Sequence, residues 1–394
     1  MDNSSGSSQT ASHHPECRHP RESLATRTCG RSLSICAIFR RTEAWESLVP
    51  TLETNMKNST HPEIVRAIET ARHPEVDPIR SMTELPLRAL YFPLGFPLEI
   101  HTNSPDVLAA ADQSWGFFQP KFSYPPLTFR LGVTEDTPGS SELPPAPVCC
   151  AQGNLLSNIA DAHNFVISDL DAGFSFGWIT QRTSKTPLYL RYHILEAAAL
   201  CMISALRVIA FHAACVAPSK HGMLLCGDSG AGKSTLAFAG ARVGWTFVSD
   251  DASYLPFDRD DRMVIGNCHQ VRLRDSSVQL FPELEGRPVT PRATGKPSIE
   301  IPTAELPGLI TADAATVKYI IFLNRRGVGA PGLFPFCREA ALSWFKKAPL
   351  RGRVSYLAQE AAIHHLVDLE IFELRYTSLD WAIGRLQTLA VAGH

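Results

Sequence analysis

A glycine-rich segment near the middle of the chain limits the possible folds more than any other feature. Residues 227–234 read Gly-Asp-Ser-Gly-Ala-Gly-Lys-Ser and match G-x-x-x-x-G-K-[ST] at every fixed position. By chance such a match arises in roughly one chain in a hundred of this length. The apolar run Gly222–Cys226 precedes the segment, and the helix-forming run Ser234–Ala241 follows it. Because strand, loop and helix in this order form a phosphate-binding loop, we expect an α/β domain here.

The predicted loop combines several groups that bind phosphate. Its glycines let successive backbone N–H groups turn inward at the start of a helix, where the helix dipole also favours anions. Lys233 would reach the β- and γ-phosphates, and the Ser234 hydroxyl would complete the coordination of Mg²⁺. We therefore predict ATP and Mg²⁺ as cofactors; the alternative is a glycine-rich turn that binds no phosphate. The predicted nucleotide-binding residues are Gly227, Asp228, Ser229, Gly230, Ala231, Gly232, Lys233, Ser234 and Thr235.

A pair of aspartates follows the next predicted strand. The run Thr246–Ser249 reads as that strand, and Asp250 and Asp251 stand at its carboxyl end. A strand end beside a phosphate loop is where a carboxylate meets Mg²⁺ or the attacking group. Asp250 lies only 17 residues after the loop lysine (250 minus 233), whereas most P-loop ATPases and GTPases carry their acidic strand further along. The sequence also lacks Leu-Ser-Gly-Gly-Gln and Asn-Lys-x-Asp, which disfavours transporter ATPases and GTPases. The alternative is that the two aspartates only form a turn.

These features together resemble the C-terminal catalytic domain of the HPr serine kinase/phosphorylase family and its HPr-kinase-like relatives. The matching residues are Phe211-His212-Ala213, the loop at 227–234 and Ser249-Asp250-Asp251, within about residues 188–323. In that family a histidine stands upstream of the loop at a similar separation, here 15 residues (227 minus 212). A double aspartate also ends the family's next strand.

The resemblance implies a kinase mechanism. Asp250 is similar to the family's catalytic carboxylate, the base that takes the proton of an acceptor hydroxyl as it attacks the γ-phosphate. Asp251 would lie beside the metal with Ser234, and His212 would lie near the transferring phosphate together with Lys233. Such a reaction needs positioning, charge stabilisation and one base. For His212 the alternative is a histidine packed in the core.

Two departures from the family pattern bear on the substrate. Ser234-Thr235 stands where the family usually has Ser-Glu, and the family's Gly-Leu-Gly-Ile-Ile-Asn-Val-Arg signature has no counterpart. HPr and the reverse phosphorolysis reaction are therefore not expected. The acceptor could be another protein, a peptide or a small hydroxyl compound. Two other functions stay open, which are a non-catalytic ATP-binding sensor or scaffold and a simple ATPase switch.

The chain divides into three predicted parts. Residues 1–58 form a disordered tail, because up to Arg41 they hold six arginines, three acids and few apolar anchors; an alternative is that translation begins at Met56. Residues 83–187 form a small α+β domain, which could present the acceptor or drive oligomerisation. Residues 188–394 form a P-loop domain of the HPr-kinase type, with a mixed sheet flanked by helices.

Several elements are predicted around the loop. Strands are expected at 89–92, 98–101 and 127–134, a hairpin at 165–179, and a central strand at 318–323. Helices are expected at 105–115, 188–209, 359–369 and 378–391, with a short strand at 371–376. Arg272, Arg274, Lys296, Arg325 and Arg326 could bring positive charge to the phosphates, although each is more often a solvated surface charge.

Composition excludes other classes of function. The 37 basic and 39 acidic residues give a net charge of −2, which argues against binding to nucleic acid by bulk charge. No run of about 18 uncharged apolar residues is present, so we expect no membrane span. The ten cysteines are irregularly spaced and no signal sequence opens the chain, so we expect reduced thiols and a cytoplasmic location. The expected partners are a nucleotide and a hydroxyl acceptor, and a homo-oligomer with further copies of the chain stays open.

Overall fold

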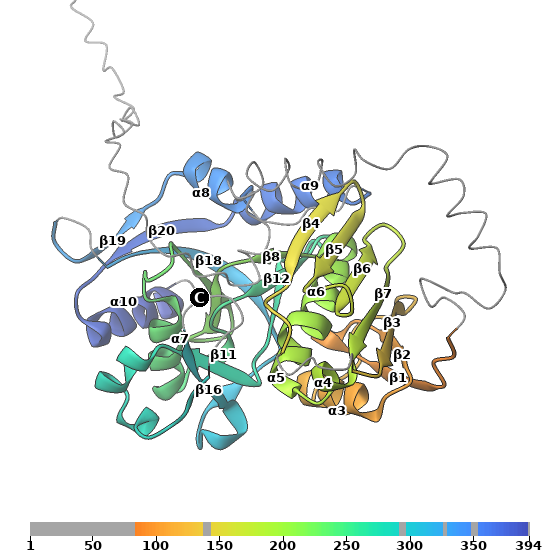
Figure 1. The fold of residues 1–394 in the computed structure, drawn as a ribbon. Helices are drawn as coiled ribbons and strands as arrows, with labels where there is room; N and C mark the ends of the chain where they lie inside the picture. Colours follow the sequence, from red (N-terminus) through yellow and green to blue (C-terminus); the bar gives the residue numbers. More distant parts are fainter. Residues whose placement is uncertain (1–82, 137–142, 291–296, 326–328, 348–353, 393–394) are drawn as a thin grey trace, which may run out of the picture. The chain divides into compact units, whose positions relative to one another are not determined.

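A computed structural model describes residues 83–136, 143–290, 297–325, 329–347 and 354–392. All of these residues belong to one compact unit of the chain, residues 32–394. The predicted tail at residues 1–58 lies outside the described residues. The described chain is a mixed α/β protein, in which helices pack on two large sheets that each contain parallel and antiparallel strands (Figure 1).

The first sheet is built from the chain before residue 181. Its strand order is β1-β2-β3-β7-β6-β5-β4, and β2 and β7 both run parallel to β3. The strands predicted at 89–92, 98–101 and 127–134 and the hairpin at 165–179 are confirmed, but the hairpin of β4 and β5 was not predicted. The strands are β1 Leu87–Tyr91, β2 Leu98–Thr102, β3 Leu127–Thr134, β4 Val148–Gln152, β5 Leu155–Ile159, β6 Phe165–Asp169 and β7 Phe174–Thr180.

Helices pack against one face of this sheet in a shared apolar cluster. The predicted helix at 105–115 is confirmed as α3, whereas the predicted helix at 188–209 is wrong at its end. The chain forms a π-helical turn near the start of this range and then α6, which ends at Leu206. The helix stops there because Val208 and Ile209 pair in the second sheet, where β-branched side chains are favoured. The helices are α3 Pro105–Trp115, α4 Gln181–Ser184, α5 Pro187–Tyr189, the π-helix Leu190–Leu195 and α6 Glu196–Leu206.

The second sheet has ten strands and carries the glycine-rich loop. Its main order is β17-β11-β9-β10-β18-β13-β12-β8, with β20 pairing β18 and β19 pairing β20. The predicted central strand at 318–323 is confirmed within β18, which lies parallel to both β10 and β20. The strands are β8 Val208–Phe211, β9 Ala214–Ala217, β10 Gly222–Cys226, β11 Thr246–Ser249, β12 Ser253–Pro256, β13 Met263–Gly266, β17 Ile310–Thr311, β18 Ala314–Asn324, β19 Gly332–Pro335 and β20 Glu370–Arg375.

Both faces of the second sheet are covered. Along β10, Met223 and Leu225 pack with α7 and α10, whereas Leu224 and Cys226 pack with α8 and α9. A fully apolar strand suits this position because neither of its faces meets water. The predicted C-terminal helices and the strand between them are confirmed as α9, α10 and β20. The helices are α7 Lys233–Arg242, α8 Arg338–Phe345, α9 Tyr356–Leu366 and α10 Leu379–Ala392.

A third, small sheet lies beside the loop. It has the order β14-β16-β15, formed by Gln270–Leu273, Ser298–Pro302 and Val289–Thr290. Val271 and Leu273 of β14 pack into the same apolar cluster as α7, so this sheet is held against the helix that follows the loop.

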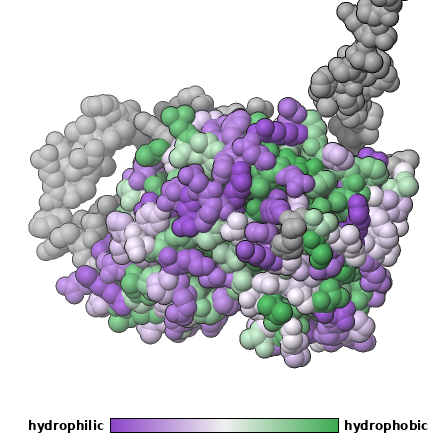
Figure 2. Space-filling view, turned by 180° about the vertical axis from the view of Figure 1, so that it is seen from behind, coloured by the Kyte–Doolittle hydropathy of each residue, from purple (hydrophilic) through white to green (hydrophobic). Residues whose placement is uncertain are grey.

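Two further observations concern the surface and the thiols of the described residues. None of the helices in the described ranges is long and apolar enough to cross a membrane. Figure 2 shows hydrophilic and hydrophobic residues interspersed over the face that it displays. The thiols of Cys149, Cys150, Cys201, Cys215, Cys226 and Cys268 are free.

Candidate functional site

The glycine-rich loop and the aspartate pair lie at one edge of the second sheet. Strand β9 is antiparallel to both β10 and β11, so β10 and β11 run in the same direction and end at the same edge. Strand β10 leads into the loop, and β11 leads into Asp250 and Asp251. The Ser234 hydroxyl donates a hydrogen bond to the main-chain carbonyl of Asp250 at 3.1 Å. The start of α7 and the aspartate pair are therefore in direct contact.

The loop backbone depends on glycine. Gly227, Gly230 and Gly232 have φ angles of +141°, +90° and +99°, a region that residues with a side chain rarely adopt. Helix α7 begins directly after Gly232. The Lys233 side chain is only 5% exposed, and its Nζ donates to the carbonyls of Gly227 at 2.8 Å and Asp228 at 3.2 Å. The ammonium group is thus held inside the curve of the loop.

His212 meets Asp251 where two strand connections run side by side. Strand β12 pairs with β8, aligning Ser253 with Phe211, and β11 pairs with β9, aligning Ser249 with Cys215. The links β8–β9 and β11–β12 must therefore be neighbours, which brings His212 Nδ1 to 3.2 Å from Asp251 Oδ1. The same ring nitrogen lies 3.1 Å from the Asp251 carbonyl oxygen.

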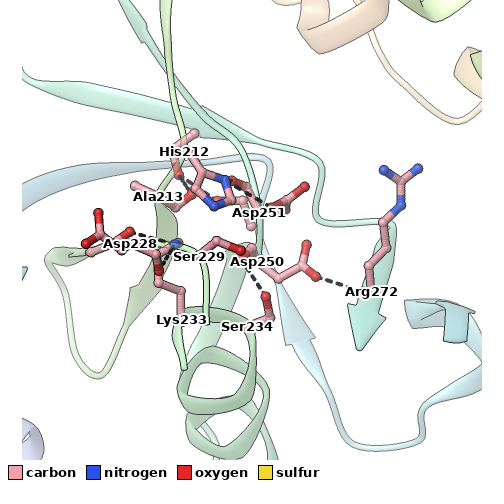
Figure 3. A network of polar contacts seen from close by, with 12 residues as sticks. His212, Ala213, Asp228, Ser229, Lys233, Ser234, Asp250, Asp251 and Arg272 are labelled. Atoms are coloured by element: carbon pink, nitrogen blue, oxygen red, sulfur yellow. Dashed lines mark hydrogen bonds and ion pairs between the residues drawn. The ribbon is translucent and has the colours of Figure 1, made fainter. Parts of the chain in front are cut away.

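Asp250 points away from this pair and toward the small sheet. Its Oδ2 accepts a hydrogen bond of 2.7 Å from the backbone N–H of Arg272, and the residue is 6% exposed. Figure 3 shows the Asp250 carboxylate directed at the Arg272 main chain, while the guanidinium extends away from it. The two aspartates, although adjacent in sequence, thus have different neighbours.

A small cavity of about 200 Å³ opens in front of the loop. Six of the predicted nucleotide-binding residues line it: Ser229, Gly230, Gly232, Lys233, Ser234 and Thr235. Gly227, Asp228 and Ala231 do not line it. His212 and Asp251 also face this cavity, whereas Asp250 does not.

Positive charge surrounds the same cavity. Arg272, Arg274 and Arg325 line it, and one Arg274 nitrogen donates to the Ser229 hydroxyl at 3.3 Å. The predicted contributors Lys296 and Arg326 lie outside the described residues. The guanidinium groups of Arg274 and Arg325, the Lys233 ammonium and the start of a helix form an environment that suits a polyphosphate.

The oxygen donors at this cavity suit Mg²⁺. Ser234 supplies a hydroxyl and Asp251 a carboxylate, and both line the cavity. Within the described ranges, His, Cys, Asp and Glu form no group of three or more that could hold a metal ion. Mg²⁺ is usually held by one or two carboxylates together with substrate phosphates rather than by a protein cage. The residues present therefore fit Mg²⁺ carried with a nucleotide.

A second, larger cavity of about 580 Å³ adjoins the first. Asp251 and Arg272 line both cavities, and Asp250 lines only the larger one. Residues of α3, the π-helix, α6, β14 and β16 form its walls. Asp250 thus lies on the boundary between the two spaces, with its carboxylate on the side away from the loop.

Two largely buried ion pairs in the larger cavity were not predicted from the sequence. Arg272 Nε lies 3.3 Å from Glu300 Oε1, and an Arg191 nitrogen lies 3.5 Å from Glu196 Oε1. The Tyr192 hydroxyl donates to Glu300 at 2.5 Å, and its ring lies under both guanidinium groups. The available signal in the sequence was a lone acidic residue in an apolar run, such as Glu196 at the start of α6, but such a signal does not identify the partner of the acid.

Burial and these partners alter the ionisation of the network. Burial raises the pKa of Tyr192 to about 12, so its hydroxyl keeps its proton at neutral pH. Burial also raises the pKa of Glu196, against the opposing effect of the nearby arginines. For Arg272, burial lowers the pKa, but Glu300 and Glu196 outweigh it and the pKa is raised. Arg272 is therefore a permanent cation at the junction of the two cavities.

Similarity to known proteins is found among solved structures. No protein-family model matches the chain, and no curated protein matches it. Among solved structures, the HPr(Ser) kinase/phosphatase from Coxiella burnetii is similar over 47% of this chain and 95% of that chain, with 13% sequence identity and a TM-score of 0.28.

Proposed function

We propose that this protein is an ATP- and Mg²⁺-dependent kinase that transfers the γ-phosphate to a hydroxyl of an acceptor. The observation that carries the proposal is the position of Asp250, a buried carboxylate between a cavity suited to phosphates and a second cavity large enough for an acceptor. A general base must stand within reach of the proton that it removes and beside the phosphate that is attacked. Of the residues that carry the family resemblance, His212, Lys233, Ser234, Asp250 and Asp251 each line at least one of the two cavities.

Each residue has a role in the proposed mechanism. The loop N–H groups, Lys233 and Arg274 would bind the phosphate chain, while Ser234 and Asp251 would hold Mg²⁺, which would supply neutralisation of the phosphate charge. His212 orients the Asp251 carboxylate through their 3.2 Å contact. These groups would stabilise the negative charge of the transferring phosphate, so direct transfer needs no covalent intermediate on the protein.

Asp250 carries out the proton transfer. The acceptor oxygen forms a bond to the γ-phosphorus, and the bond from that phosphorus to the β–γ bridging oxygen breaks. ADP leaves with the electron pair of the broken bond, and the Asp250 carboxylate takes the hydroxyl proton. The hydrogen bond from Arg272 N fixes Oδ2, so the carboxylate is positioned before an acceptor arrives.

A transfer assay with Lys233→Ala tests the proposal. Wild type, Lys233→Ala and a control, Lys220→Ala, are incubated with γ-labelled ATP, Mg²⁺, a cell lysate and a metabolite pool. Lys220 is an exposed lysine that lines neither cavity. We expect wild type and Lys220→Ala to label an acceptor. Lys233→Ala should lower the transfer rate at least about 100-fold, because it removes the ammonium group that stabilises the negative charge of the transferring phosphate.

The same assay separates the alternatives. ATP binding with neither an acceptor product nor ADP would identify a sensor or scaffold. Release of ADP and inorganic phosphate without a labelled acceptor would identify an ATPase switch. Either result would overturn the kinase assignment.

A further inference from the structure

The larger cavity has the size of a small-molecule site. Its volume of about 580 Å³ lies within the range of roughly 300–1,000 Å³ that holds compounds of metabolite size. It is distinct from the smaller space in front of the loop, and the base proposed above lines only this larger space. An acceptor seated here would approach the γ-phosphate from the Asp250 side.

Apart from Asp250 and Asp251, the acidic side chains that line the cavity lie beside arginines. Arg191 pairs with Glu196 and Arg272 pairs with Glu300, and all four side chains are less than a fifth exposed. His269 also lines the cavity, and burial lowers its pKa, which keeps the ring neutral at pH 7. The aspartates at the junction would repel an anionic acceptor. An uncharged acceptor therefore enters without leaving a buried charge unpaired, which would be costly.

The paired charges still offer both hydrogen-bond donors and acceptors. Guanidinium N–H groups can only donate and carboxylates can only accept, so each ion pair presents both kinds of group side by side. Hydroxyl groups both donate and accept, and a molecule carrying several of them matches such a surface.

One wall of the cavity is aromatic. Trp115, Phe117 and Phe118 come from the end of α3 and the residues after it, and Tyr254 faces the same space. The Phe117 ring centroid lies 4.3 Å from that of His269, and Phe117 is 39% exposed. Ring compounds with several hydroxyls have C–H faces that pack on aromatic rings while their rims form hydrogen bonds. The aromatic and polar lining together therefore favours a ring compound with several hydroxyls over a simple aliphatic alcohol.

We propose that the larger cavity binds the phosphate acceptor and that the acceptor is an uncharged polyhydroxylated small molecule, a sugar or a cyclitol. This inference rests on the proposed kinase function. One hydroxyl of the acceptor faces Asp250, and the ring lies against the aromatic wall formed by Trp115, Phe117, Phe118 and Tyr254.

The test uses matched phenylalanine variants of the full chain. Phe117→Ala removes part of the aromatic wall, and Phe334→Ala removes a ring that is equally exposed, at 38%, but lines neither cavity. Wild type and both variants receive ATP, Mg²⁺ and four separate acceptor panels, which are neutral sugars with cyclitols, amino sugars, sugar acids, and serine-containing peptides. Mass spectrometry identifies the product, and the KM values for ATP and acceptor are measured separately.

We expect a neutral sugar or cyclitol to be phosphorylated, and Phe117→Ala to raise its KM about tenfold while the KM for ATP is unchanged. Phe334→Ala should leave both KM values unchanged. Preferred labelling of a charged panel or of a peptide would overturn the inference, as would a Phe117→Ala variant that raises the KM for ATP instead of that for the acceptor.

Failure of the inference is distinguishable from failure of the kinase function. Labelled protein in the lysate with no labelled sugar or cyclitol overturns the inference and leaves the kinase function standing. ATP binding without transfer to any panel or to the lysate overturns both.

Discussion

Replacing Asp250 by asparagine separates the chemistry of the site from its architecture. Asparagine has nearly the same shape, and its amide oxygen can accept the 2.7 Å hydrogen bond from Arg272 N that now reaches Asp250 Oδ2. A hydrogen bond to a charged acceptor contributes about 1.5–3 kcal/mol and a neutral one about 0.5–1.5 kcal/mol. The expected loss of unfolding free energy is therefore about 1 kcal/mol.

The expected loss of activity is much larger. A positioned general base contributes roughly 10²–10⁴-fold to the rate, which corresponds to about 2.7–5.5 kcal/mol of transition-state stabilisation. Asp250 does not line the cavity in front of the loop, so the affinity for ATP should change by less than about threefold. The variant should thus be folded and bind nucleotide but transfer phosphate slowly.

Three measurements check this expectation. Urea denaturation gives the unfolding free energy, calorimetry with a non-hydrolysable ATP analogue gives the affinity, and γ-labelled ATP gives the transfer rate. The matched control is Asp251→Asn, which alters the neighbouring carboxylate that lines both cavities. In that control the half-saturating Mg²⁺ concentration should rise. A transfer rate for Asp250→Asn within tenfold of wild type would refute the assignment of the base, and so would an ATP affinity that falls as much as the rate.

Two further predictions concern stability. In Gly232→Ala the new Cβ would lie 2.9 Å from the Tyr376 hydroxyl, whereas in Gly230→Ala, also at positive φ, it would meet nothing within 4 Å. Denaturation should therefore show a loss of about 1–2 kcal/mol for Gly230→Ala and a greater loss for Gly232→Ala; equal losses would show that the contact with Tyr376 is unimportant. Burial lowers the pKa of His193 to about 4, so the unfolded chain binds more protons between pH 4 and 6.5, and His193 makes stability rise with pH there. Discounted for partial exposure, His193 changes the unfolding free energy by about 1–2 kcal/mol across this pH range. His193→Gln should reduce the pH dependence of the unfolding free energy by that amount, and an unchanged pH dependence would contradict the assigned role of His193.

Local sequence was sufficient to predict the elements around the loop. The order of strand, glycine-rich loop and helix at 222–242 depends on residues that are neighbours in sequence, and so does the strand that ends before Asp250. The helix predicted at 188–209 failed at its end because the pairing of Val208 and Ile209 with β12 is a non-local interaction. Local propensity cannot account for such a partner.

The candidate site shows the same division. Sequence determined which residues could bind phosphate, because the loop pattern and the aspartate pair each lie within one short segment. Only the tertiary structure decided that Asp250 and Asp251 face different neighbours, since this depends on β14 bringing Arg272 N to Asp250 and on the strand pairing that brings His212 to Asp251.

The larger cavity was decided by tertiary structure alone. Its ion pairs join Arg191 to Glu196 within one helical segment and Arg272 to Glu300 across two strands, and its aromatic wall comes from the end of α3. No single segment carries a pattern for it, because its shape and charge balance arise only when these separate elements pack together. The sequence therefore determined the candidate phosphate-binding segment, while packing between distant segments decided which cavities and side chains lie beside it.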